Sequence, residues 1–292
     1  MTGVQSMPNK GSSDIHFKGM TYTAALPDGS LRSENQIYED MKKFTKLSDQ
    51  IRLYSTDGEM AKHVFSALNK LGVKTTVYMG LWIRRGAEDM QKDLDNLLAI
   101  LTADPKNAKR VKYLSVGNEE IYNKMDMGQL IGYIEKVRGV LKSKGLKDIL
   151  VGTTEIESNW YKQLADKCDF FGVNIQTQFG APMETSVDYA RSAIERYGRF
   201  QGWIKDYRNN KPIVVAEVGH STSQKAELTG FVQEWLCAAN RDNIDYYYFS
   251  FRDEPWKAPG DPANIENHFG YLDGNNSPKV NSKTLTCSAP NK

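Results

Sequence analysis

Short apolar runs alternate along the chain with longer segments in which apolar residues recur at helical spacing. The short runs, rich in β-branched and aromatic residues, predict strands over residues 17–22, 50–54, 74–81, 111–117, 149–153, 170–175, 212–217 and 246–251. The longer segments predict amphipathic helices over residues 37–47, 59–71, 87–101, 127–144, 160–167, 185–207 and 224–240.

This alternation is typical of βαβ units and a parallel sheet. Eight such strands in 292 residues predict an α/β fold with a single (β/α)8 TIM barrel. An open doubly wound sheet is the alternative, and it would carry a glycine-rich GxGxxG turn after its first strand. Residues 19–24 read GMTYTA, which lacks that spacing. We expect residues 1–14 to form a disordered leader, and residues 15–292 to form the barrel domain with a C-terminal tail.

Composition narrows the partners of the chain. A net charge of +2 does not favour nucleic acid or an anionic membrane surface, and no run reaches the roughly 18 apolar residues of a membrane span. The four histidines are scattered along the sequence, so we expect no metal site. We also expect no cofactor, and we expect a monomer. Of three cysteines, Cys237 and Cys287 could form a bridge that leaves Cys168 free, a pairing that the sequence leaves open.

The main candidates for chemistry are two glutamates, Glu119 and Glu217, at the ends of the fourth and seventh predicted strands. The carboxyl ends of barrel strands build the active site in this fold. The two positions are 217 − 119 = 98 residues apart, about three βα units, which places them across one cleft. Two carboxyl groups facing one cleft suit the cleavage of a glycosidic bond, which needs a proton for the leaving oxygen and an anion for the oxocarbenium-like transition state.

Other strand ends supply groups that suit a sugar. Aromatic rings can stack on pyranose faces and amides can bind hydroxyl groups, so we expect substrate contacts from Tyr22, Tyr54, Trp82, Asn118, Asn174 and Trp256. The two tyrosines could equally be core aromatics. Glu120 is expected to orient its neighbour or to be solvated, and Glu155 and Glu157 are expected more often as solvated loop charges. The histidines are expected to pack or to lie on the surface, with His220 the best candidate for a place in the cleft.

At these residues the chain resembles glycoside hydrolase family 17, the β-1,3-glucanases and β-1,3-glucanosyltransferases. The resemblance spans nearly the whole chain from residue 15 and rests on Gly19-Met20-Thr21-Tyr22, Ile51-Arg52-Leu53-Tyr54, Val116-Gly117-Asn118-Glu119, Asp253-Glu254-Pro255-Trp256-Lys257 and the HFGYLDG segment at residues 268–274. It implies a retaining enzyme in which Glu119 is the acid/base and Glu217 the nucleophile. It also implies that Glu254 and Lys257 lie near the nucleophile and the sugar bound there, and that the protein is secreted or in the cell wall.

The chain departs from the family beside the nucleophile. The family usually continues Glu-Thr-Gly-Trp-Pro-Ser, whereas residues 217–221 read EVGHS, and Gln176 and Gln178 stand where aromatic residues are common. The linkage preference, endo or exo attack, the number of subsites and the ratio of transfer to hydrolysis therefore stay open. Two rival readings are a non-catalytic β-glucan-binding barrel and a metal-dependent hydrolase. The retained glutamates argue against the first, and the absence of a histidine-rich rim argues against the second.

Overall fold

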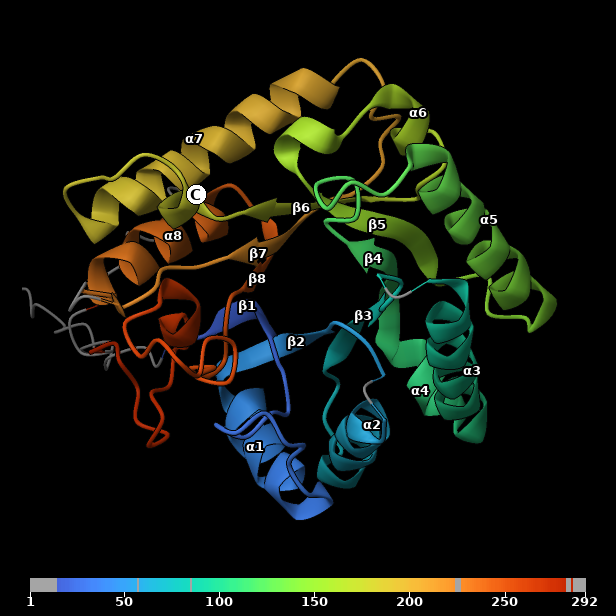
Figure 1. Ribbon diagram of the computed structural model, residues 1–292, viewed down its shortest axis with the longest axis horizontal. Coiled ribbons are helices and arrows are strands. Elements are labelled where there is room, and N and C mark those ends of the chain that lie inside the picture. Colours follow the sequence, from blue (N-terminus) through green and yellow to red (C-terminus); the bar gives the residue numbers. More distant parts are fainter. Residues whose placement is uncertain (1–14, 57, 85, 224–226, 282–284, 286–292) are drawn as a thin grey trace, which may run out of the picture.

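The protein is a closed barrel of eight parallel strands in the order β1-β2-β3-β4-β5-β6-β7-β8, which confirms the predicted (β/α)8 fold (Figure 1). The computed structural model describes residues 15–281 except 57, 85 and 224–226, together with residue 285. The strands are β1 (Phe17–Thr21), β2 (Ser48–Leu53), β3 (Thr76–Leu81), β4 (Val111–Asn118), β5 (Leu150–Ile156), β6 (Phe171–Ile175), β7 (Ile213–Val218) and β8 (Asp245–Tyr248). The predicted leader, residues 1–14, and Cys287 lie outside the described residues.

Helices cover the outside of the barrel (Figure 1). They are α1 (Glu34–Leu47), α2 (Met60–Leu71), α3 (Ala87–Ala103), α4 (Pro105–Arg110), α5 (Met127–Ser143), α6 (Lys162–Ala165), α7 (Ser186–Ile204) and α8 (Thr229–Arg241). The sequence did not predict α4, a single short turn-and-a-half capped by the Asp104 side chain with a proline in its first turn. No helix among the described residues is both long and apolar enough to cross a membrane.

Two strand ends differ from the prediction by three residues. β5 runs to Ile156, three residues further than expected, because Glu155 and Ile156 pair with Val173 and Asn174 of β6. β8 ends at Tyr248: Phe249 N–H still donates to Val218 O of β7 at 2.8 Å, but Ser250 N–H donates to Phe269 O at 3.0 Å, outside the sheet.

Aromatic rings fill part of the barrel interior. Tyr78 of β3 lies 5.3 Å from Tyr247 of β8 and 5.6 Å from Phe170, ring centroid to ring centroid. These strands are not neighbours in the sheet, so the rings meet across the barrel interior. The Arg52 guanidinium lies 5.2 Å from the centroid of the Tyr78 ring, so these aromatic residues pack beneath a charged side chain of β2.

The chain after β8 closes onto α1. Arg252 makes a bidentate ion pair with Asp40, with its two terminal nitrogens 2.9 and 2.6 Å from the carboxylate oxygens. Asn276 accepts hydrogen bonds from the same guanidinium. Cys237 in α8 is disulfide-bonded, and Cys168 is free and buried. The partner that the sequence suggested for Cys237 lies outside the described residues.

Candidate active site

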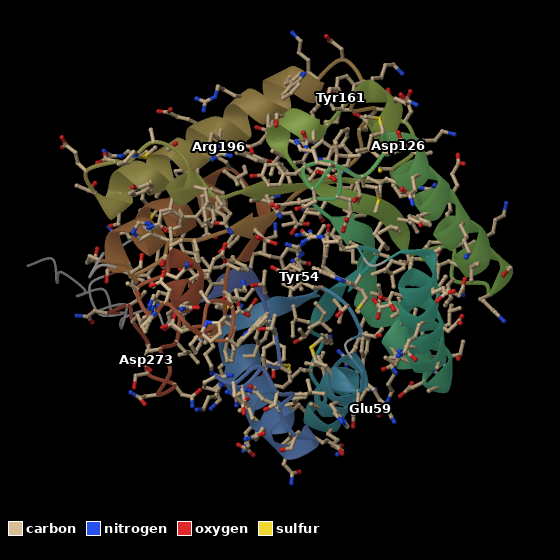
Figure 2. All side chains as sticks on the ribbon, viewed as in Figure 1. Tyr54, Glu59, Asp126, Tyr161, Arg196 and Asp273 are labelled. Carbon is tan, nitrogen blue, oxygen red and sulfur yellow. The ribbon has the colours of Figure 1, made fainter. Side chains whose placement is uncertain are left out.

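A cleft of about 910 Å³ opens at the carboxyl ends of the strands, a volume at the upper end of those found for ligand pockets. Residues at or just beyond the carboxyl ends of all eight strands contribute to its walls, and Tyr54 lies at the mouth of the barrel (Figure 2). Eight of the ten expected site residues line it: Tyr54, Trp82, Asn118, Glu119, Asn174, Glu217, Trp256 and Lys257.

Glu217 stands near the end of β7 with several donors around its carboxylate. Arg52 Nη1 and the Tyr54 hydroxyl both donate to Oε1 at 2.9 Å, and Gln176 Nε2 lies 3.4 Å from Oε2. Only 8% of the residue is exposed. Three donors, one of them a guanidinium, suit a carboxylate that remains an anion and has its orientation fixed.

Glu119 follows β4 directly and has a backbone conformation that is uncommon for a residue with a side chain, with φ at 60°. Gly117, two residues earlier, has φ at 80°, and a Cβ there would lie 2.4 Å from the Glu120 side chain. Only glycine fits at position 117, and the turn that it permits directs Glu119 into the cleft.

The environment of Glu119 differs from that of Glu217. The Glu119 carboxylate accepts one hydrogen bond, from Asn174 Nδ2 at 2.8 Å. Burial raises the pKa of Glu119, and the charge of Glu217 raises it further, while the Asn174 hydrogen bond and Arg52 oppose the rise. The protonated form of this carboxyl group is therefore favoured to higher pH than in a solvated glutamate.

A buried polar network connects the two glutamates. Arg52 Nη2 donates to Asn118 Oδ1 at 2.6 Å, and Asn174 Nδ2 lies 3.1 Å from the same oxygen. Asn174 is also the ladder partner of Glu217 between β6 and β7. Strands β2, β4, β6 and β7 are thereby tied together at the base of the cleft, which fixes both carboxyl groups relative to each other.

Lys257 reaches the cleft from the loop after β8. Its Nζ lies 2.7 Å from Glu254 and 3.7 Å from Glu266. Burial alone would lower the pKa of Lys257, but the charge and hydrogen bond of Glu254 and the charges of Glu266 and Glu217 together outweigh it, so the net shift is upward. Glu254 does not line the cleft; it lies behind Lys257 and accepts a hydrogen bond from Thr23.

Trp82 follows β3 and lines the cleft, and its backbone is hydrogen-bonded to Asp93 of α3. Asp93 Oδ2 accepts from Trp82 N–H at 2.8 Å, and Oδ1 accepts from Thr56 N–H at 2.7 Å. Arg84 lies 4.9 Å from the Trp82 ring and donates to the Asn118 carbonyl at 2.9 Å. The loops after β2 and β3 are thus joined through one carboxylate.

The expected substrate contact from Tyr22 is wrong, and the alternative reading as a core aromatic holds. Only 1% of Tyr22 is exposed, its hydroxyl donates to Asp40 at 2.9 Å, and it packs against Phe44 and Phe251. It therefore contributes no surface to the cleft, where Thr23 stands instead. His220, the best candidate among the histidines for a place in the cleft, packs in the interior, as expected of the histidines in general. It stacks on the Phe231 ring at 5.3 Å, and burial lowers its pKa to about 4.

Two glutamates expected as solvated loop charges are not solvated. Glu155 is fully buried at the end of β5. Glu157 forms a bidentate ion pair with Arg196, a cleft-lining residue of α7 (Figure 2). Glu120 is also buried, with Arg84 Nε 3.8 Å from its carboxylate, and burial raises its pKa.

Arg52 and Asp93 are among the site residues that the sequence did not single out. The available signal for Arg52 was a charged residue between Ile51 and Leu53 within a predicted strand, because such a residue is buried only with partners. Asp93 carried no comparable signal, since an aspartate in an amphipathic helix is usually solvated. Among the described residues, no group of three or more His, Cys, Asp or Glu side chains is arranged to hold a metal ion.

A family model described as the BtgE/BtgC glycoside hydrolase domain matches residues 19–270. The chain belongs to this family. Among its relatives are a probable glucan endo-1,3-beta-glucosidase btgC of Aspergillus fumigatus, 27% identical over 283 residues, and the glucan endo-1,3-beta-glucosidase btgC of Emericella nidulans, also 27% identical over 283 residues. These matches cover 87% and 82% of the chain but only 40% and 41% of the relatives, so the chain spans less than half of their length.

Solved structures share the fold. The glycoside hydrolase family 17 beta-1,3-glucanosyltransferase of Rhizomucor miehei superposes with a TM-score of 0.76 at 22% identity, covering 92% of this chain and 98% of that one. An endo-laminarinase from Formosa gives a TM-score of 0.76 at 18% identity, covering 88% and 83%. With the family model, these neighbours confirm the resemblance to glycoside hydrolase family 17.

Proposed function

We propose that the chain is a retaining β-1,3-glucan hydrolase or glucanosyltransferase with Glu217 as nucleophile and Glu119 as acid/base. The observation that carries the proposal is the unequal environment of two carboxyl groups in one cleft. Donors that include a guanidinium surround Glu217, whereas burial and the charge of Glu217 raise the pKa of Glu119. An anion beside a protonated acid is the arrangement that a retaining glycosidase needs.

In the first step, a Glu217 oxygen attacks the anomeric carbon as the glycosidic carbon–oxygen bond breaks. Glu119 gives its proton to the departing oxygen, so the leaving chain departs as a neutral alcohol. Glu217 is then an ester of the sugar and Glu119 is ionised. Tyr54 and Arg52, which bonded the Glu217 anion, remain in place to orient the ester.

In the second step, Glu119 takes the proton of an acceptor hydroxyl group while that oxygen attacks the anomeric carbon and the Glu217 ester bond breaks. Water as acceptor gives hydrolysis, and another glucan gives a transferred chain. Both outcomes restore the starting protonation states, so the acceptor alone decides between them.

The family and its named relatives favour β-1,3-glucan as the substrate. Two cleft residues, Trp82 and Trp256, offer rings of the kind that stack on pyranose faces, and Asn118 and Asn174 lie beside both glutamates. The disulfide-bonded state of Cys237 favours an oxidising compartment, which agrees with a secreted or cell-wall protein.

Alanine replacement of each glutamate tests the proposal. We expect Glu217→Ala and Glu119→Ala each to lose nearly all turnover of a β-1,3-linked glucose pentamer, while Glu135→Ala, an exposed residue of α5 paired with Lys167, remains as active as the unaltered protein. Near-normal turnover in either active-site variant would refute the assignment. Binding of the pentamer without any product from the unaltered protein would favour the non-catalytic glucan-binding barrel.

The product series from the same pentamer distinguishes transfer from hydrolysis. Products longer than five sugars would identify a glucanosyltransferase, and exclusively shorter products would identify a hydrolase.

A further inference from the structure

The turn that carries Glu119 is built on the end of β5. Glu119 N–H donates to the Thr154 carbonyl at 2.8 Å. The next residue of β5, Glu155, accepts from Ile121 N–H at 2.8 Å through Oε1, and its Oε2 lies 3.4 Å from Tyr122 N. Three backbone N–H groups within four residues of the turn are therefore directed at two successive residues of one strand.

The Glu155 carboxylate is fully buried and is surrounded by donors. Asn159 of the 3-10 turn η1 (Glu157–Asn159) adds a hydrogen bond of 3.2 Å to Oε2. Among the described residues, no lysine or arginine pairs with Glu155, so all three donors are neutral groups. A buried carboxylate without a cation is costly, and such a residue is rarely found in a core unless its hydrogen bonds fix something.

What these hydrogen bonds fix is the left-handed conformation of Glu119. The backbone at φ 60° is disfavoured for a residue with a Cβ and persists only where its surroundings hold it. The turn has few other hydrogen bonds to β5. The Asn123 side chain donates to the Glu119 carbonyl, but this hydrogen bond lies within the turn and does not attach it to β5. Release of the N–H groups of Ile121 and Tyr122 would allow Glu119 to relax away from the leaving oxygen.

We propose that Glu155 is a positioning residue for the reaction: its carboxylate holds the turn at residues 119–122 so that the Glu119 carboxyl group is directed at the leaving oxygen. This inference rests on the proposed function, because it assigns Glu155 a role only if Glu119 is the acid/base. Glu155 is not among the residues that line the cleft, so it acts through Glu119.

The protonation of Glu155 is linked to that of the same residue. Burial raises the pKa of Glu155 to about 7, the hydrogen bonds from Ile121, Asn159 and Tyr122 oppose this, and the charge of Glu119 adds to it. Ionised Glu119 therefore favours the protonated form of Glu155. The carboxyl group that faces Glu155 is that of Glu119, and the other groups around it, two backbone amides and the Asn159 side chain, do not titrate.

Two variants separate position from charge. Glu155→Gln keeps the shape but presents an NH2 group to one of the donors and removes the charge, whereas Glu155→Asp keeps the charge and shortens the reach. Each is compared on two substrates. One is the β-1,3-linked glucose pentamer. The other is a β-1,3-linked glucose oligosaccharide with 2,4-dinitrophenol as the leaving group on its anomeric carbon, and this leaving oxygen needs no proton. Glu135→Gln, the same change on an exposed face of α5, is the matched control.

We expect both Glu155 variants to cleave the pentamer about 10- to 100-fold more slowly in kcat with KM little changed, the loss that follows from a misplaced catalytic group. The burst of dinitrophenolate, which reports only the first step, is expected to stay within about threefold of the unaltered protein.

Equal losses on the two substrates, or pentamer activity like that of the control, would overturn the positioning role. If Glu155→Gln does not fold, judged by its thermal unfolding, Glu155→Asp carries the comparison of substrates alone. An unaltered protein that leaves the pentamer intact would refute the proposed function, and this inference with it.

Discussion

Arg52 and Glu217 form an ion pair that is almost completely closed to solvent, with Nη1 2.9 Å from Oε1 and the guanidinium itself 1% exposed. The same guanidinium holds Asn118 through its other terminal nitrogen and lies 4.5 Å from the Tyr54 ring. One side chain of β2 therefore sets the positions of groups from β4 and β7, the two strands that carry the proposed catalytic pair.

Replacement of Arg52 by lysine should disable the site although the charge is kept. A lysine ammonium cannot reach Glu217 and Asn118 together, because it lacks the fork of the guanidinium. We expect kcat on a β-1,3-glucose pentamer to fall about 100-fold or more and the free energy of unfolding in urea to fall by about 3 kcal/mol. Arg191→Lys, whose side chain lies on the surface of α7 beside Glu234, should change neither quantity, and a comparable fall there would attribute the effect to lysine in general.

Tyr54 and Tyr22 offer a matched test of which tyrosine serves the reaction. Tyr54→Phe removes the hydroxyl that donates to Glu217, and we expect kcat to fall about 10-fold, because a hydrogen bond to a charged group is worth about 1.5–3 kcal/mol. Tyr22→Phe removes a hydroxyl that donates to Asp40. It should leave kcat and KM unchanged and lower the free energy of unfolding by about 2 kcal/mol. The reverse pattern in the kinetics would restore Tyr22 to the cleft.

The same two tyrosines show what the sequence could not reveal. Each is the last residue of a predicted strand, and nothing in the local pattern differs between them. Which face a residue takes at a strand end depends on the register of its neighbours, because side chains alternate along a strand. In the folded chain Tyr54 turns to the barrel mouth and Tyr22 to Asp40 of α1. That register is a property of the closed barrel and is absent from any single strand.

The fold and the positions of the two glutamates, by contrast, could be predicted because they follow from repetition. Strands buried on both faces appear as continuous apolar runs, so all eight were found, with ends misplaced by up to three residues. Glu119 and Glu217 were found because each ends such a run. Glu155 was misjudged by the same logic: it also ends a run, but hydrogen bonds from the neighbouring turn bury it, and those donors are distant in sequence.

The raised pKa of Glu119 predicts the alkaline side of the activity profile. The proposed acid role of Glu119 requires its protonated form in the free protein, so kcat/KM should fall as pH rises through that pKa, which lies above the roughly 4.3 of a solvated glutamate. The charge of Glu217 raises this pKa and the Asn174 hydrogen bond lowers it. Carboxyl carbon NMR should therefore show the Glu119 pKa shifted down in Glu217→Gln and up in Asn174→Ala. Shifts in the same direction in both variants would contradict this account.

Asp93 predicts an effect on substrate binding that is separate from the chemistry. Asn in its place keeps one oxygen but turns an NH2 group toward the N–H of Thr56 or Trp82, so the loops after β2 and β3 lose a shared anchor. We expect KM to rise about 10-fold with kcat within about threefold, since Trp82 takes no part in the proposed proton transfers. Trp82→Ala should raise KM similarly, and the double variant should show little further rise, because residues that act through one another are not additive. Asp95→Asn, on the exposed side of the same helix beside Gln91, is the control; additive effects of the two changes would show that Asp93 acts independently of Trp82.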